Sequence, residues 1–285
     1  MSSSSHSTGE LMASDPVPIY DALRDALRAD VPVALATVIS GPGVRAKLLA
    51  GPEREVLGSL GDADLDRVVA RDALGELASG ATVTRHYGRH GEAREQVVEV
   101  FIESFAPAPR LIIFGAVDFT AALVRAGKLL GYHVTVCDAR EVFATRARFP
   151  MADEVVCDWP DRQLGKVAAA LGPRDAVCVL THDVKFDVPA IVAALETRVG
   201  YLGAMGSRRT HAERVERLRE AGVDEEGLAR VMAPIGLDIG ARTPEETAIA
   251  VCAEIIARRT GRPAPSLRDG SGPIHLHPRE VAEDA

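Results

Sequence analysis

Gly115 opens the string Gly-Ala-Val-Asp-Phe-Thr at a place where a dinucleotide-binding fold carries Gly-x-Gly-x-x-Gly. Val117 replaces the second glycine, which normally lets the backbone approach a pyrophosphate, and Thr120 replaces the third. Asp118 adds a negative charge beside the expected phosphate position. The segment is therefore either an altered nucleotide loop or a plain strand-to-helix turn that Asp118 caps.

A carboxylate and a guanidinium follow the next apolar run. Asp138 comes 23 residues after Gly115, about where an acidic residue accepts hydrogen bonds from a ribose diol. Arg140 either pairs with Asp138 or meets a phosphate of the same ligand. We expect Asp138 and the later Asp238 on surface loops, so that alanine at either position weakens ligand binding and leaves the thermal midpoint within a few degrees.

Two more polar segments each follow an apolar run. The first supplies a hydroxyl, an imidazole and a carboxylate, either for a ligand or for capping a helix, and consists of Thr181, His182 and Asp183. The second combines free backbone N–H groups at a helix start with two cations, which suits a phosphate-like anion or leaves a solvated arginine pair. It consists of Gly206, Ser207, Arg208 and Arg209.

A long loop near residue 240 ends in a helix start. Thr243 and Glu246 form the pattern of a capping box, which explains that end of the loop without any function. Gly236, Asp238 and Gly240 are not explained in this way. Two glycines around a carboxylate predict a close approach of the backbone to another group.

Composition excludes several function classes. The chain has 285 residues, 33 Lys and Arg against 41 Asp and Glu, and 4% aromatic residues, so a nucleic-acid partner is not expected. No apolar run approaches the roughly 18–20 residues that span a bilayer, and residues 1–14 lack the apolar core of a secretory signal. Four widely spaced cysteines support neither a disulfide framework nor a zinc site, which favours a reducing cytoplasm.

The N-terminal part of the chain predicts a small α+β domain over residues 15–105, after a disordered lead-in over 1–14. Helical spacing and turn signals predict helices over 18–29 and 62–77 and strands over 33–39, 44–49, 55–60, 82–87 and 96–104. The Pro-rich segment 106–110 reads as a stiff linker.

Short apolar strands alternate with longer helices from residue 111 to residue 262, which predicts a Rossmann-like parallel sheet with helices on both faces. The expected strands are 111–115, 133–137, 154–157, 176–181, 201–204 and 229–232. The expected helices are 119–131, 161–171, 186–197, 208–221 and 244–259. Residues 263–285 read as a C-terminal tail.

Five strings carry a resemblance to a known family. They are IFGAVDFTAALVRAGKLLGYHVTVCDAR, RFPMADEVV, LTHDVKFDVPAIVAAL, YLGAMGSRR and APIGLDIGARTPEETAIAVCAEIIA. Together they resemble the XdhC/CoxI family, the xanthine dehydrogenase accessory factors, over about residues 110–260. A weaker resemblance extends to VALATVIS and GSLGDADLDRVVARDALGELASG in the N-terminal part.

The resemblance implies a maturation factor that binds molybdenum cofactor (molybdopterin), assists its sulfuration and delivers it to a molybdenum hydroxylase apoenzyme of the xanthine or carbon-monoxide dehydrogenase type. Whether a cysteine desulfurase donates the sulfur, and whether the protein forms a homodimer, stay open. Two other functions also stay open: an NAD(P)-dependent oxidoreductase that uses His182 as proton donor, and a non-catalytic nucleotide-binding module.

The chain departs from the family pattern in two places. Members often carry Gly-Ala-Gly-His-Val where this chain has Gly115-Ala-Val-Asp-Phe119, and Val117 argues against a nicotinamide nucleotide. The segment commonly written Gly-Gly-Cys reads Gly61-Asp-Ala-Asp64 here. Because no cysteine precedes Cys137, a cofactor-liganding thiol in the first domain is excluded.

Overall fold

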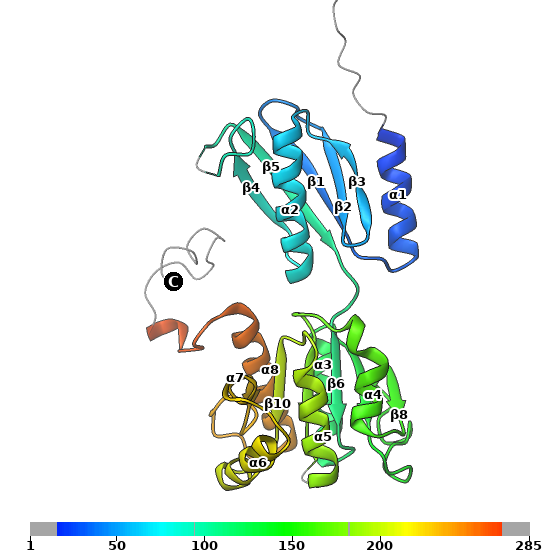
Figure 1. Ribbon diagram of the computed structural model, residues 1–285, viewed down its shortest axis with the longest axis vertical. Coiled ribbons are helices and arrows are strands. Elements are labelled where there is room, and N and C mark those ends of the chain that lie inside the picture. The colour runs from blue at the N-terminus through cyan, green and yellow to red at the C-terminus, as the bar shows by residue number, and fades with distance from the viewer. Residues whose placement is uncertain (1–15, 94, 182, 270–285) are drawn as a thin grey trace, which may run out of the picture. The chain divides into compact units, whose positions relative to one another are not determined.

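The computed structural model describes residues 16–93, 95–181 and 183–269 (Figure 1). The chain divides into two compact units, with the boundary between Ala108 and Pro109. Each unit has its own sheet and its own core. The expected lead-in and most of the expected tail lie outside the described residues. No helix in the described part of the chain is long and apolar enough to cross a bilayer.

Unit 1 is an antiparallel sheet with two helices. The strands are β1 (Val33–Ser40), β2 (Lys47–Gly51), β3 (Arg54–Ser59), β4 (Val83–Tyr87) and β5 (Val98–Phe105), in the order β3-β2-β1-β5-β4. Alternate residues of β1 face opposite cores: Ala34 and Ala36 pack with α2 (Ala63–Ser79), and Val33 and Leu35 pack with α1 (Pro16–Arg28). The two helices thus cover opposite faces of the sheet.

Asp62 begins α2 as predicted, since its side chain accepts the N–H groups of Asp64 and Leu65. The second strand starts later than expected, because residues 41–45 form a turn in which Gly43 and Arg45 have positive φ. The described part of this unit is small and α+β, as the sequence predicts.

Unit 2 is a six-stranded parallel sheet. Its strands are β6 (Arg110–Phe114), β7 (His133–Cys137), β8 (Glu154–Val156), β9 (Ala176–Val179), β10 (Tyr201–Ala204) and β11 (Val231–Met232). The order β8-β7-β6-β9-β10-β11 is that of a dinucleotide-binding fold. Arg110, which was expected in the linker, begins β6 because it pairs with His133.

Helices cover both faces of this sheet, as predicted. They are α3 (Asp118–Leu129), α4 (Pro160–Val167), α5 (Val184–Leu195), α6 (Arg208–Glu220), α7 (Glu225–Ala229) and α8 (Pro244–Thr260). The core with α3 and α8 holds Leu111 and Ile113, whereas the core with α4 and α5 holds Ile112 and Phe114. Full burial of such side chains stabilises the unit by about 1.5–3 kcal/mol each.

Two helical segments differ from the prediction. Helix α7 is not predicted by the sequence, because five residues are too few to show a helical period. Asp224 caps this short helix by accepting the N–H of Gly227. The helix expected over 161–171 ends at Val167 and continues as a 3₁₀ turn over Ala168–Ala170.

Candidate functional site

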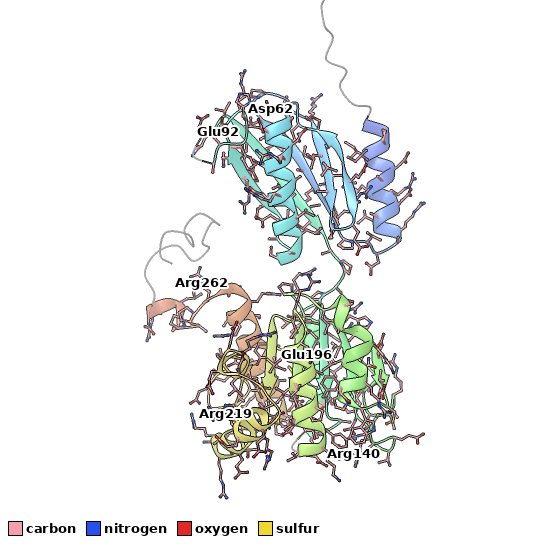
Figure 2. All side chains as sticks on the ribbon, in the orientation of Figure 1. Asp62, Glu92, Arg140, Glu196, Arg219 and Arg262 are labelled. Atoms are coloured by element: carbon pink, nitrogen blue, oxygen red, sulfur yellow. The ribbon has the colours of Figure 1, made fainter. Side chains whose placement is uncertain are left out.

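The carboxyl edge of the unit 2 sheet brings the predicted site segments to one end of the unit. Neighbouring β6 and β9 lead to helices on opposite faces, which makes this edge a topological switch point, the place where ligands bind in folds of this kind. The turns after β7, β10 and β11 lie along the same edge. Figures 1 and 2 show α6 and the labelled Arg140 at this end of unit 2.

The backbone conformation and close packing at position 115 require a glycine. Its φ is +108°, and a Cβ atom there would lie 2.9 Å from the backbone nitrogen of Thr181. Its N–H donates to the carbonyl of Cys137 over 2.9 Å. The glycine therefore allows the loops after β6 and β9 to pass close together at the switch point.

Backbone N–H groups of the β6–α3 turn are largely used within the protein. The N–H of Ala116 donates to Asp138 Oδ2 over 2.8 Å, and that of Val117 donates to Thr120 Oγ1 over 3.2 Å. The buried Thr120 hydroxyl in turn donates to the Gly115 carbonyl. The Thr120 side chain thus takes the place of the third glycine and forms hydrogen bonds to the backbone of its own loop.

The helix after this turn begins at Asp118, with Val117 at the cap position, so the prediction of Asp118 as the cap is wrong. The Val117 N–H finds its acceptor in Thr120, three residues on, and this spacing is the signal that sequence reasoning missed. The exposed Asp118 side chain lies in the first helical turn, where it opposes an anionic ligand.

Asp138 is buried and bonded on both oxygens, so its expected place on a surface loop is wrong. Oδ1 accepts the N–H and Nε of Arg140, and Oδ2 accepts Nη2 of Arg140 and the N–H of Ala116, all over 2.8–2.9 Å. Burial by itself raises the pKa of this carboxyl, but the hydrogen bonds from Arg140 and Ala116 outweigh it and hold the pKa below its ordinary value. Four donors leave no lone pair for a ribose diol.

Arg140 also anchors the loop that follows β7. Its guanidinium lies 4.4 Å from the centre of the Phe143 ring, and the guanidinium of Arg148 lies 5.4 Å from the same centre. Arg148 Nη1 donates to the carbonyl of Ala116 over 3.0 Å. Sequence reasoning missed Phe143 and Arg148, because a contact to Ala116 from so far along the chain leaves no local pattern.

The turn after β9 combines a buried hydroxyl with an exposed carboxylate. The side chain of Thr181 accepts the N–H of Asp183 over 3.2 Å, and Asp183 caps α5 by accepting the N–H of Lys185 over 3.0 Å. Both interactions are those of a helix cap, one of the two predicted roles. His182 lies outside the described residues.

The β10–α6 turn keeps its N–H groups open. Ser207 caps the helix by accepting the N–H of Thr210 over 3.1 Å, as predicted. No described residue accepts the N–H groups of Gly206, Arg208 or Arg209. In the described part of the chain, the exposed Arg209 side chain pairs only with Glu213 on its own helix. The turn therefore has the donors and cations that an anion needs.

A fully buried ion pair lies beneath this turn. Arg214 of α6 donates from Nε to Oδ2 of Asp187 over 3.1 Å and from Nη2 to the carbonyl of Met205 over 2.8 Å. The pair joins α5 to the loop that carries Gly206. Arg214 and Leu218 share a face of α6 at a spacing of four residues, and this spacing was the available signal for an inward-facing arginine.

The loop after β11 packs on α8. The N–H of Gly236 and the hydroxyl of Tyr201 both donate to Glu254 Oε2, over 2.9 and 2.5 Å. A Cβ atom at Gly236 would lie 3.2 Å from the backbone nitrogen of Val251, so the predicted close approach is to this protein's own helix. Asp238 is exposed.

The capping box of Thr243 and Glu246 is present as predicted. Gly240 is exposed, with a φ of +75° and no atom near the position of a Cβ. Its φ places it in the left-handed region that favours glycine, and this need is local to the loop.

Contacts join some of the predicted residues directly. Gly115 meets Thr181, and Asp138 meets Arg140. The described residues form no cluster of three side chains suited to a metal ion. Of the four cysteines, three are buried and Cys157 is exposed.

Comparison with known proteins settles the family. Residues 111–255, just over half of the chain, match the family model of the XdhC Rossmann domain. Residues 26–88 match the model of the XdhC and CoxI family. The chain belongs to the XdhC/CoxI family. The fold described above and the resemblance carried by the five sequence strings agree with this membership.

Two curated relatives of this XdhC/CoxI chain carry functional names. A Bacillus subtilis protein, named as a probable xanthine dehydrogenase component, is 34% identical over 58% of this chain and 47% of its own length. The molybdenum cofactor insertion chaperone PaoD of Escherichia coli is 30% identical over 56% of this chain and 43% of its own length. The chain thus spans less than half the length of either relative.

A solved structure shares the fold of this XdhC/CoxI chain. A Bacillus halodurans protein described as a xanthine dehydrogenase aligns with a TM-score of 0.51 and 22% identity, over 86% of this chain and 97% of the other. At this identity, the likeness shows the fold alone.

Proposed function

We propose that this protein binds molybdenum cofactor, assists its sulfuration and inserts it into a molybdenum hydroxylase of the xanthine or carbon-monoxide dehydrogenase type. The observation that carries the proposal is family membership over residues 111–255. The name of the PaoD relative, a molybdenum cofactor insertion chaperone, supports the same role. A cytoplasmic location and a cysteine desulfurase as sulfur donor belong to the proposal.

The open turn at the start of α6 supports a site for the anionic end of that cargo. The pterin of this cofactor carries a phosphate, and three N–H groups without an acceptor among the described residues stand beside Arg208 and Arg209. A helix N-terminus with free donors stabilises a bound phosphate. The turn at α3 is less suited, because its N–H groups at 115–117 are occupied and Asp118 is negative.

A nicotinamide-dependent oxidoreductase is the second candidate, favoured by the strand order alone. Two details of the structure oppose it. Asp138 has all its acceptor positions filled, and Val117 stands where the backbone must meet a pyrophosphate. The arrangement of side chains at the carboxyl edge of the sheet therefore supports the cofactor-chaperone function better than the oxidoreductase function.

Co-expression with a molybdenum hydroxylase tests the proposal. The protein should raise both the activity and the sulfurated fraction of the client enzyme. The variant R208A/R209A should bind cofactor about 10-fold to more than 100-fold more weakly, because a charge-assisted contact from an arginine to phosphate is worth about 1.5–3 kcal/mol when it is partly buried. The matched control R217A/R219A removes two arginines from the other end of the same helix.

The outcomes separate the role from the site. A client that is equally active and equally sulfurated with and without this protein refutes the maturation role. If R208A/R209A supports the client as well as the wild type does, the anion site at α6 is wrong and the maturation role stands. If the control variant fails as well, the effect reflects the charge or stability of α6, and the anion site is again unsupported.

A further inference from the structure

An aromatic pair stands at the carboxyl edge beside the turns already described. Trp159, the single tryptophan of the chain, follows β8, and Phe186 lies in the first turn of α5, after β9. Their ring centres are 5.0 Å apart, with the planes inclined by 51°. The Trp159 side chain is exposed by 41%, although indole is a large apolar group. The predicted site residues do not include either ring.

Short contacts tie the segment before Trp159 to the segment that carries Asp138 and Arg140. The thiol of Cys137, the residue before Asp138, donates to the carbonyl of Asp158, the residue before Trp159, over 3.3 Å. The thiol of Cys157 lies 3.7 Å from the carbonyl of Ala139. The loops after β7 and β8 are thus joined at Asp158, which precedes Trp159, and at Ala139, which precedes Arg140.

Two charged groups, Asp183 and Arg140, lie on turns at the same edge of the sheet. Asp183, the cap of α5, is exposed three residues before Phe186. The hydrogen bond and charge of Asp138 raise the pKa of Arg140, and the negative charge of Asp183 contributes to the same shift. The N–H of Phe186 donates to the backbone carbonyl of Asp183 over 2.9 Å, so the carboxylate of Asp183 belongs to the same helix start as the Phe186 ring. The aromatic pair offers a stacking surface, and Asp183 offers a hydrogen-bond acceptor.

We infer that Trp159 and Phe186 form the subsite for the planar heteroaromatic ring of the cargo, a pterin, with the Asp183 carboxylate accepting N–H groups from its amino-pyrimidinone edge. This inference rests on the proposed function, because that function supplies a pterin as the ligand. It assigns the ring to the turns after β8 and β9, apart from the Gly206 turn proposed for the phosphate.

Stacking explains why an aromatic residue stands at this exposed position. A heteroaromatic ring on a tryptophan or phenylalanine side chain contributes about 1–3 kcal/mol, which corresponds to about 5-fold to 160-fold in affinity. A leucine would supply apolar area without a π face. Phe186 holds the indole in place from the side of α5, so that both rings should affect binding.

The test titrates the full chain with pterin-6-carboxylate as the probe. Tryptophan fluorescence follows binding to the wild type and to Phe186→Leu, and calorimetry follows Trp159→Leu and Trp159→Phe. We expect the two leucine variants to bind about 5-fold to 160-fold more weakly, and Trp159→Phe to remain close to the wild type. Tyr20→Leu is the matched control, because it removes a 65% exposed aromatic side chain from unit 1.

The inference is overturned if the probe does not bind the wild type saturably, if the leucine variants bind it equally well, or if Tyr20→Leu loses as much affinity as they do. AMP serves as a competitor, and tighter binding of AMP than of the pterin would assign the pair to a nucleobase instead. Molybdenum cofactor that co-purifies with the wild type tests the proposed function separately. If the wild type carries cofactor and Trp159→Leu carries as much, only the ring subsite is wrong.

Discussion

Replacement of Asp138 by alanine should destabilise unit 2, contrary to the expectation from the sequence. The carboxylate is buried and accepts four hydrogen bonds, so its removal leaves the N–H of Ala116 without an acceptor. An unsatisfied buried donor costs about 1–3 kcal/mol. The loss of the pair with Arg140 adds about 0–1 kcal/mol, because the Arg140 side chain is 44% exposed and water can solvate it.

A combined loss of about 1–4 kcal/mol lowers the thermal midpoint of a unit of this size by about 2–16 °C. Trp159 is the only tryptophan and lies in the same unit as Asp138, so its fluorescence during urea or thermal unfolding reports on that unit. Asp138→Asn should fall between the wild type and the alanine variant, because its amide oxygen still accepts the N–H of Ala116.

The exposed Asp238 provides the control, since Asp238→Ala should leave the midpoint within about 2 °C. The pH dependence gives a second check. The folded pKa of Asp138 lies below its unfolded value of about 3.9, so its stabilisation is present above that pH and is lost as the pH falls through the folded pKa. An Asp138→Ala midpoint equal to the wild type at pH 7, or a gap between the two proteins that does not narrow below about pH 4, would refute this reasoning.

Four further outcomes are expected. In a urea titration, Gly115→Ala should lower the free energy of unfolding by about 1–3 kcal/mol, because the φ of Gly115 is positive and an added Cβ would meet Thr181. Gly165→Ala is the control, because this helical position has open space around it, and the change should be neutral or stabilising. His90 should titrate by NMR above the usual histidine pKa of about 6.5, because its ring nitrogen bonds Asp62. The stabilisation from this pair is full below that pH and is lost as the pH rises through the folded pKa. Asp62→Ala should return the pKa of His90 to its ordinary value. A thiol reagent at pH 8 should label Cys157 quickly and the three buried cysteines only after unfolding, with fast labelling of all four counting against the buried positions. Calorimetry with NAD and NADP should give dissociation constants weaker than roughly 100 μM, and low-micromolar binding would favour the oxidoreductase.

Local sequence patterns determined most of the elements. Alternating or continuous apolar runs placed the strands, because side chains on a strand repeat every two residues. Caps such as Asp62, Ser207 and the Thr243 capping box marked helix starts within one or two residues, because each cap acts over three residues of chain. The alternation of strand and helix predicted the parallel sheet, and the five sequence strings indicated the family.

Tertiary structure alone decided which polar groups are free to meet a ligand. The Asp138 carboxylate, after β7, accepts the N–H of Ala116, after the neighbouring β6. The N–H groups at the start of α6, in contrast, find no acceptor among the described residues. The sequence leaves both turns open, because a hydrogen bond between residues 22 apart follows from strand order and loop path rather than from local spacing. The pairing of Trp159 with Phe186 has the same origin: they follow β8 and β9, which two other strands separate, and only the packing of α4 on α5 brings their rings together.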